Sequence, residues 1–259
     1  MIVEIVDFIS EERLKTYVNH TDRQERAIAL HNHTLQLGSS LMSMIALFEL
    51  ALRNSANLRI AEALGDQDWL LSQGAGLPLL KTEKNAIKTA IKHARKAAYS
   101  KLSYKEKSYL DAFAYPGGIP AGTSHETKTA ARQALFVVSN GQVISQTTLY
   151  FWKRLFSADY EEAIWKKSLK KVFPNKNLKR SNVSTALEKV YAIRNRVAHH
   201  EPVYGDRLHD VIESLEFLRD SLGARSGEQN TKFQAFSRLQ HLRLRMDYEN
   251  FLEAWKTLT

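Results

Sequence analysis

Residues 21–65 read TDRQERAIALHNHTLQLGSSLMSMIALFELALRNSANLRIAEALG and predict one long helix. Two overlapping capping-box patterns, Thr21-x-x-Gln24 and Asp22-x-x-Glu25, can open it, and Gly65 is a natural residue to follow its last turn. Its middle carries an apolar stripe at helical spacing, made by Leu41, Met44, Ile45, Phe48 and Leu52. We therefore expect a core helix over 21–64, with Gly38 as the point where it can bend.

The rest of the chain has the same helical periodicity, and only 11 Gly and 5 Pro interrupt it. A loop rich in Gly and Pro is predicted over 115–123, and no run of short strands or repeat is visible. Further helices are predicted over 79–113, 125–138, 143–156, 159–172, 183–200, 206–222 and 232–257. The sequence thus predicts an all-α, bundle-like fold in a single domain over 1–259, with a polar linker over 223–231.

Composition excludes several classes of protein. The 259 residues include no cysteine, which rules out disulfides, thiolate metal sites and cysteine nucleophiles and suits a reducing compartment. The N-terminal residues lack the pattern of a signal peptide, and the least charged stretch, 27–48, is too polar for a membrane span. We expect a soluble cytoplasmic protein that does not enter a membrane.

The positive charge is clustered. The chain has 37 Lys and Arg against 28 Asp and Glu, a net charge of +9. Residues 81–107 carry a net +7 and residues 165–180 another +7, so the remaining chain sums to 9 − 14 = −5. Either cluster alone is explained by a solvated helix face, but the two together favour an anionic partner, with nucleic acid first. Four interleaved aromatic residues either stack on unpaired bases or belong to the core: Tyr99, Tyr104, Trp165 and Phe173.

Common enzyme signatures are absent. The sequence has no phosphate-binding G-x-x-x-x-G-K-[ST] loop, no G-x-G-x-x-G and no G-x-S-x-G. The pairs His31-x-His33 and His199-His200 lack a carboxylate at ligand spacing on the same helix face. We therefore expect no metal site and no cofactor.

Residues 190–202, VYAIRNRVAHHEP, hold the most informative motif. Arg194 precedes His199 by five positions, a spacing that Arg26 and His31 also show, so spacing alone decides nothing. The residue types suit RNA cleavage without metal. Arginine offers a permanently charged fork for phosphate, and histidine can donate and accept protons near neutral pH. On an ideal helix five residues advance about 140° beyond a full turn, so the two side chains flank a cleft.

The flanking residues carry a wider resemblance. The stretch LEKVYAIRNRVAHHEPVY, residues 187–204, resembles the HEPN superfamily and, within it, the Abi-like (abortive infection, AbiD/AbiF-type) family. Residues 48–54, FELALRN, are similar to that family's E-x-x-x-R-N element, and 148–156, TLYFWKRLF, to its central pattern. The resemblance covers most of 22–220 and is weakest over about 70–140. It implies a HEPN-like helical bundle with additional helices, commonly a homodimer.

The resemblance also implies an activity. Members are metal-independent endoribonucleases with an R-x4-6-H motif, acting in phage defence or as toxins restrained by an antitoxin protein or a small RNA. Arg194 would then hold the scissile phosphate and His199 would act as acid and base, with Asn195 and His200 assisting. In a homodimer, two such helix ends would supply the second proton-transfer group. Tentative RNA contacts are Arg53, Asn54, Arg196, Lys88, Lys92, Lys166, Lys167, Lys170 and Lys171.

Several of these residues also have a purely structural explanation. Glu49 and Arg53 can simply form an i,i+4 ion pair, and Asn195 can orient its neighbour or cap the helix. His200 can share the work of His199 or face solvent. The alternative function is a non-catalytic helical module of a defence system that binds RNA or protein.

Overall fold

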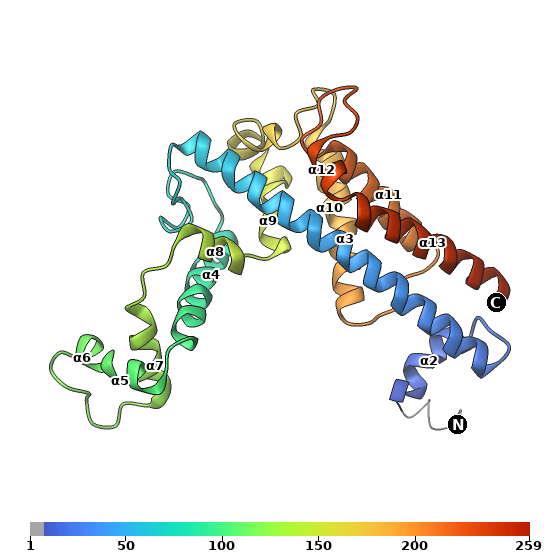
Figure 1. Ribbon diagram of the computed structural model, residues 1–259. Helices are drawn as coiled ribbons and strands as arrows, with labels where there is room; N and C mark the ends of the chain where they lie inside the picture. The colour runs from blue at the N-terminus through green and yellow to red at the C-terminus, as the bar shows by residue number, and fades with distance from the viewer. Residues whose placement is uncertain (1–7) are drawn as a thin grey trace. The chain divides into compact units, whose positions relative to one another are not determined.

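The computed structural model describes residues 8–259, which contain helices and turns but no strand. About 70% of the chain is helical, which confirms the all-α fold class. The chain forms two compact units (Figure 1). The terminal unit comprises the chain up to Leu52 together with Phe173–Thr259, and the central unit comprises Arg53–Val172. The expected single domain over 1–259 stays a prediction.

Within residues 8–259, the terminal unit holds six helices or parts of helices. They are α2 (Glu11–Val18), the first part of α3 (Gln24–Leu64), α10 (Arg180–Ala198), α11 (Asp206–Ser221), α12 (Lys232–Phe236) and α13 (Arg238–Leu258). The central unit holds the rest of α3 and shorter elements. They are α4 (Lys81–Ser100), α5 (Tyr104–Tyr109), α6 (Asp111–Ala114), α7 (His125–Ala134), α8 (Asn140–Gln146) and α9 (Leu149–Leu155), followed by the 3-10 helix η1 (Ala158–Tyr160), the π-helix η2 (Glu161–Trp165) and the 3-10 helix η3 (Leu169–Lys171).

Helix α3 confirms the predicted long helix and its end. Gly65 follows the last turn with φ +66°, and the Asp66 N–H bonds back to the carbonyl of Ala61 at 3.2 Å. The helix continues through Gly38 without interruption. This glycine instead permits close packing, because a Cβ built on it would lie 3.2 Å from Cγ1 of Val197 on α10. The residue predicted as a bend is a helix-crossing point.

Several predicted helices are divided, and at most of the breaks a short polar side chain bonds to the backbone and competes with the helix. The helix expected over 79–113 is three helices, and a capping box of Ser103 and Glu106 opens the second. The helix expected over 143–156 breaks at Thr147 and Thr148, where Thr148 caps α9. The C-terminal helix expected over 232–257 breaks at Ser237. The segment 159–172 forms 3-10 and π turns rather than one helix.

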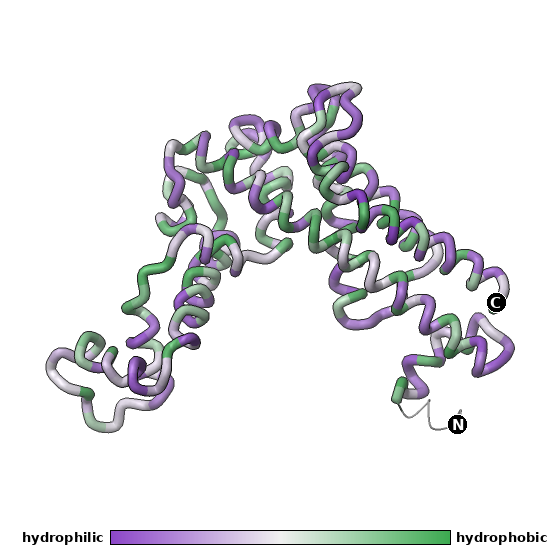
Figure 2. Tube along the Cα trace, in the orientation of Figure 1, coloured by the Kyte–Doolittle hydropathy of each residue, from purple (hydrophilic) through white to green (hydrophobic). Residues whose placement is uncertain are grey.

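In the terminal unit, α10 and α11 pack against each other along their apolar faces. Hydrophobic and hydrophilic residues are interspersed along the chain (Figure 2). The buried residues of the two helices are Val183, Ala186, Leu187, Val190, Ile193, Leu208, Val211, Ile212, Leu215 and Leu218. This packing fixes the end of α10, where the Arg-His motif lies.

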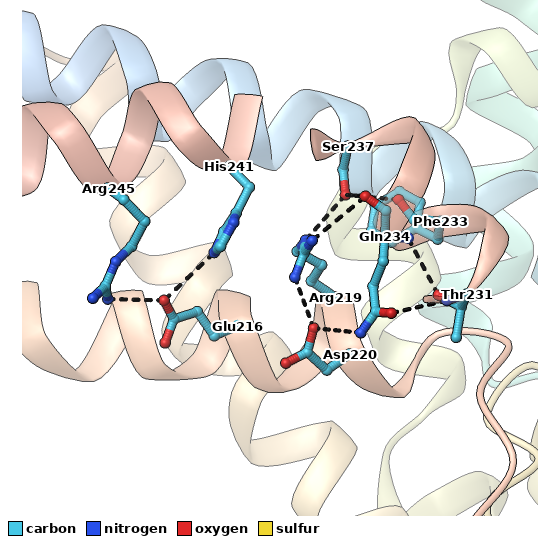
Figure 3. Close-up of polar contacts among 9 residues, drawn as sticks. All are labelled: Glu216, Arg219, Asp220, Thr231, Phe233, Gln234, Ser237, His241 and Arg245. Atoms are coloured by element: carbon cyan, nitrogen blue, oxygen red, sulfur yellow. Dashed lines mark hydrogen bonds and ion pairs between the residues drawn. The ribbon is translucent and has the colours of Figure 1, made fainter. Parts of the chain in front are cut away.

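A polar network joins α11 to α12 and α13 (Figure 3). Arg219 donates from Nε to the Ser237 hydroxyl at 3.3 Å and from Nη2 to the Gln234 carbonyl at 3.4 Å. Glu216 accepts from Arg245 at 2.9 Å and lies 3.6 Å from Nε2 of His241. The C-terminal helices are therefore tied to the motif-bearing pair through α11.

The central unit has an aromatic core and a buried charge. Trp69 and Trp152 meet edge to face with ring centroids 6.3 Å apart. Glu83, only 1% exposed, accepts from Nε of Arg154 at 3.0 Å and from the Tyr160 hydroxyl at 2.7 Å. Burial raises the pKa of the Tyr160 phenol to about 12. The hydrogen bond to Glu83 raises the pKa of Arg154, so this guanidinium stays charged.

Of the helices in residues 8–259, α3 alone is long and apolar enough to cross a membrane, with a mean hydropathy of 1.5 over its most apolar window. The core helix of a soluble protein meets the same criterion, and Leu37, Leu41 and Phe48 of α3 are buried in the terminal unit. The expected cytoplasmic location therefore stays a prediction.

Candidate functional site

The Arg-His motif lies where α10 ends. Two backbone bonds close the helix, from Glu201 N–H to the Arg196 carbonyl at 2.8 Å and from His200 N–H to the Val197 carbonyl at 2.9 Å. This pair is the Schellman arrangement, in which His199 is the last helical cap and His200 follows it. The helix thus stops before Pro202, as predicted, and presents both histidines at its negative end, where a cation is favoured.

His200 adopts a backbone conformation that L-residues rarely occupy. Its φ is +55°, in the left-handed region where glycine normally completes this helix ending. A non-glycine residue there costs about 1 kcal/mol. Such strain is often found at functional sites, which makes His200 a candidate on backbone grounds as well as on its imidazole.

Arg194 lies one turn earlier, half-buried, beside Asn195. Its Nη1 donates to the Asn195 side-chain oxygen at 3.4 Å, and no carboxylate in the described chain pairs with it. His199 is exposed, and its imidazole forms no hydrogen bond, ion pair or ring contact within residues 8–259. The guanidinium and the imidazole are therefore both available to a ligand. Asn195 lies where it can orient the arginine, one of the roles expected for it.

Arg196, a tentative RNA contact, is engaged by the chain itself. Its Nη1 lies 3.1 Å from the Glu201 carboxylate, and its Nη2 donates to the Pro202 carbonyl at 3.2 Å. These bonds hold the loop after α10 against the helix. Arg194 and Arg196, two residues apart, thus differ: the first has an uncompensated charge, and the second is neutralised by Glu201.

A cavity of about 320 Å³ lies beside the motif within the terminal unit. His200 and Glu201 line it together with residues of α2 and α3, among them Tyr17 and Thr34. Its walls are mostly apolar, and burial raises the pKa of the Tyr17 phenol, so this group stays protonated. Sequence reasoning missed this cavity, because no local pattern relates residues 17–42 to 197–203.

The other predicted RNA contacts are distributed over the central unit. Arg53 donates to the Ile144 carbonyl at 3.4 Å, whereas Asn54 is exposed. Lys88 and Lys92 are exposed on α4. In the second cluster, Lys166 pairs with Glu162, Lys170 lies 5.4 Å above the Trp165 ring, and Lys167 and Lys171 are exposed. Burial lowers the pKa of Lys170.

The interleaved aromatic residues mostly belong to the core. Trp165 is 5% exposed, Phe173 is fully buried, and Tyr99 packs edge to face on Phe136. Of the four, Tyr104 alone is open to solvent, at 88% exposed. The hypothesis that RNA bases stack on Tyr99, Trp165 or Phe173 is therefore wrong, because these rings are buried.

Residues 8–259 contain no group of three or more His, Cys, Asp or Glu side chains placed to hold a metal ion. His31 is buried in the core, edge to face with Tyr17, and its Nδ1 has no partner within the described part of the chain. Burial lowers the pKa of His31. The pair Arg26 and His31, which matches the motif's spacing, therefore differs from Arg194 and His199, because its histidine is enclosed.

The site, then, is an uncompensated arginine and an exposed histidine at a helix end, next to a strained histidine and a small cavity. No family model, no curated protein and no solved structure matches this chain.

Proposed function

We propose that this protein is a metal-independent endoribonuclease that cleaves RNA at the end of α10. The observation that carries the proposal is the contrast between two arginines. Arg194 has no carboxylate partner, while Arg196 is neutralised by Glu201. A half-buried arginine without a counter-ion is suited to a phosphate, whose oxygens its fork can bind in pairs.

The reaction would be an internal transesterification. The 2′-OH attacks the neighbouring phosphorus, the bond from phosphorus to the 5′ oxygen breaks, and the products are a 2′,3′-cyclic phosphate and a 5′-OH. Arg194 would stabilise the charge on the pentacoordinate phosphorus, which exists only in the transition state. His199 would transfer a proton, as a base toward the 2′-OH or as an acid toward the leaving oxygen.

One histidine does not perform both proton transfers at once. His200 is adjacent, and a homodimer that apposes two ends of α10 would supply a second His199. Either arrangement gives one base and one acid, and Asn195 would hold Arg194 in place. The resemblance to Abi-like HEPN proteins supports the same chemistry and suggests phage defence or a toxin under an antitoxin protein or small RNA as its setting.

Cleavage of a labelled single-stranded RNA by the purified protein tests the proposal. We expect cleavage in the presence of EDTA, none of a 2′-deoxy substrate, and cyclic-phosphate ends by mass spectrometry. His199→Ala and Arg194→Ala should each lower the rate at least a hundredfold, the usual scale for a lost acid, base or charge donor. The control variant Arg207→Ala/His209→Ala removes the same residue types from exposed positions of α11 and should cleave normally.

Two results would overturn the proposal: loss of cleavage with EDTA, or full activity in His199→Ala. Binding of RNA without cleavage by the wild type would instead identify the non-catalytic helical module. Growth of cells expressing the protein separates these outcomes independently. A nuclease toxin slows growth while the Arg194→Ala/His199→Ala variant does not, whereas a binding module has the same effect in both forms.

A further inference from the structure

Helix α4 of the central unit carries five of its six Lys and Arg residues on a single face. Lys81, Lys84, Lys88, Lys92 and Arg95 follow one another at intervals of three or four residues. At 100° per residue they fall within about 80° of one another, and they span about 21 Å along the axis. We call these five residues the α4 stripe. At about 3.4 Å for each stacked nucleotide, its length matches about six nucleotides of one strand.

No carboxylate compensates the α4 stripe. The one acid of α4 is Glu83, which lies on the buried side of the helix and pairs with Arg154. The four lysines are exposed and form no ion pair within residues 8–259. Five aligned and uncompensated cations are unfavourable for the isolated protein, because they repel one another, and they become favourable beside a linear polyanion.

A cavity of about 610 Å³ opens beside the C-terminal half of the stripe, between α4 and the segment that follows α7. Lys88, Lys92 and Arg95 line it, and the residues around it include no Asp or Glu. Ile91 and Val138 supply buried apolar walls, and two amides, Gln73 and Gln133, supply hydrogen-bonding groups. Arg95 bonds to the Phe136 carbonyl at 3.1 Å and so fixes the segment that forms the far wall.

The geometry points to a single-stranded RNA site on the central unit. We infer that phosphates follow the α4 stripe and that one unstacked base enters the cavity, between its apolar walls and beside its amides. A run of acidic side chains would use the stripe but supplies no planar ring for this cavity, and a duplex keeps its bases stacked inside. The inference relies on the proposed function only for its choice of RNA, since binding needs neither Arg194 nor His199.

Binding of an oligouridine of about twelve nucleotides to the full-length His199→Ala protein, followed by fluorescence anisotropy, tests this site without cleavage. The stripe variant adds Lys84→Gln, Lys88→Gln and Lys92→Gln. The control variant adds Lys232→Gln, Arg238→Gln and Lys256→Gln, which remove the same charge from exposed positions of the terminal unit. Because each phosphate contact contributes about 0.7 to the slope of log K against log salt, the stripe variant should lose about 2 from that slope. The control should lose none.

Filling the cavity tests the base separately. Ala134→Phe places a ring in the cavity without changing charge, and it should weaken binding about tenfold while the salt slope stays the same.

The matched RNA duplex should bind more weakly than the single strand, and a polyglutamate of equal length should compete poorly. The inference is overturned if the parent fails to bind RNA, if stripe and control variants behave alike, or if polyglutamate competes as well as RNA. Circular dichroism of each variant checks that it is folded. If the wild type binds RNA but does not cleave it, the proposed nuclease activity is refuted and the inferred binding site on α4 is not.

Discussion

Val197 lies directly against Gly38, where α10 crosses α3. A Cβ added at Gly38 would lie 3.2 Å from Cγ1 of Val197, closer than most real contacts of this type. The absence of a side chain at one residue thus sets the distance between the two helices. The end of α10 and its motif depend on this contact, because Val197 is two residues before His199.

The crossing predicts coupling between the two residues. Gly38→Ala gains about 1 kcal/mol of helix propensity but must push Val197 away. In a Val197→Ala background the new methyl has room, so the same substitution should be more favourable there by about 1 kcal/mol. Urea unfolding of the four proteins in this double-mutant cycle measures the difference. Equal effects of Gly38→Ala in both backgrounds would show that the crossing is not tight.

The left-handed backbone of His200 predicts that replacing this residue by glycine raises stability while it lowers activity. His200→Gly relieves the left-handed strain and should raise the free energy of unfolding by about 1 kcal/mol. His200→Ala keeps the strain and should give no such gain. If the imidazole assists catalysis, both variants should cleave RNA more slowly than the wild type. A glycine variant no more stable than the alanine variant would contradict the strain.

The ends of α3 and α10 are predictable from the sequence, because the residues that determine them are local. Apolar spacing and Gly65 place α3 to within a few residues, and Pro202 forces α10 to end where it does. The breaks at Ser103 and Ser237 are harder to predict. There the apolar pattern continues through the break, while side-chain hydrogen bonds to the backbone compete with the helix.

Contacts between distant residues are not predictable from one sequence. Glu83 reads as an ordinary first-turn acid of α4, and its partner Arg154 lies 71 residues later. The cavity beside His200 likewise depends on residues of α2 and α3 far earlier in the chain. The α4 stripe, in contrast, is visible in the sequence once the spacing of Lys81, Lys84, Lys88 and Lys92 is compared with a helical turn.

The buried Glu83 predicts a large asymmetry between two ion pairs. Arg154→Met leaves a carboxylate with 1% exposure without its cation, which should cost about 3 kcal/mol or more of unfolding free energy. Arg59→Met breaks a surface pair with Glu62, whose atoms lie 2.9 Å apart, and should cost less than about 1 kcal/mol. Chemical unfolding of both variants tests the difference. Adding Glu83→Gln to Arg154→Met should recover part of the loss, because the buried group is then neutral.

The environment of His31 predicts how stability depends on pH. Burial lowers the pKa of His31 in the folded state, whereas in the unfolded chain it titrates near its ordinary value of about 6.5. Below that value the unfolded chain binds a proton that the folded chain does not, so the free energy of unfolding should fall as the pH falls from 7 toward 5.

His31→Phe keeps a ring against Tyr17 but cannot titrate, and it should therefore make this decrease shallower. His33→Gln, which removes an exposed imidazole two residues away on the same helix, is the matched control. Urea unfolding at intervals between pH 7 and pH 5 measures the three slopes, and identical slopes for wild type and His31→Phe would show that another group controls the decrease.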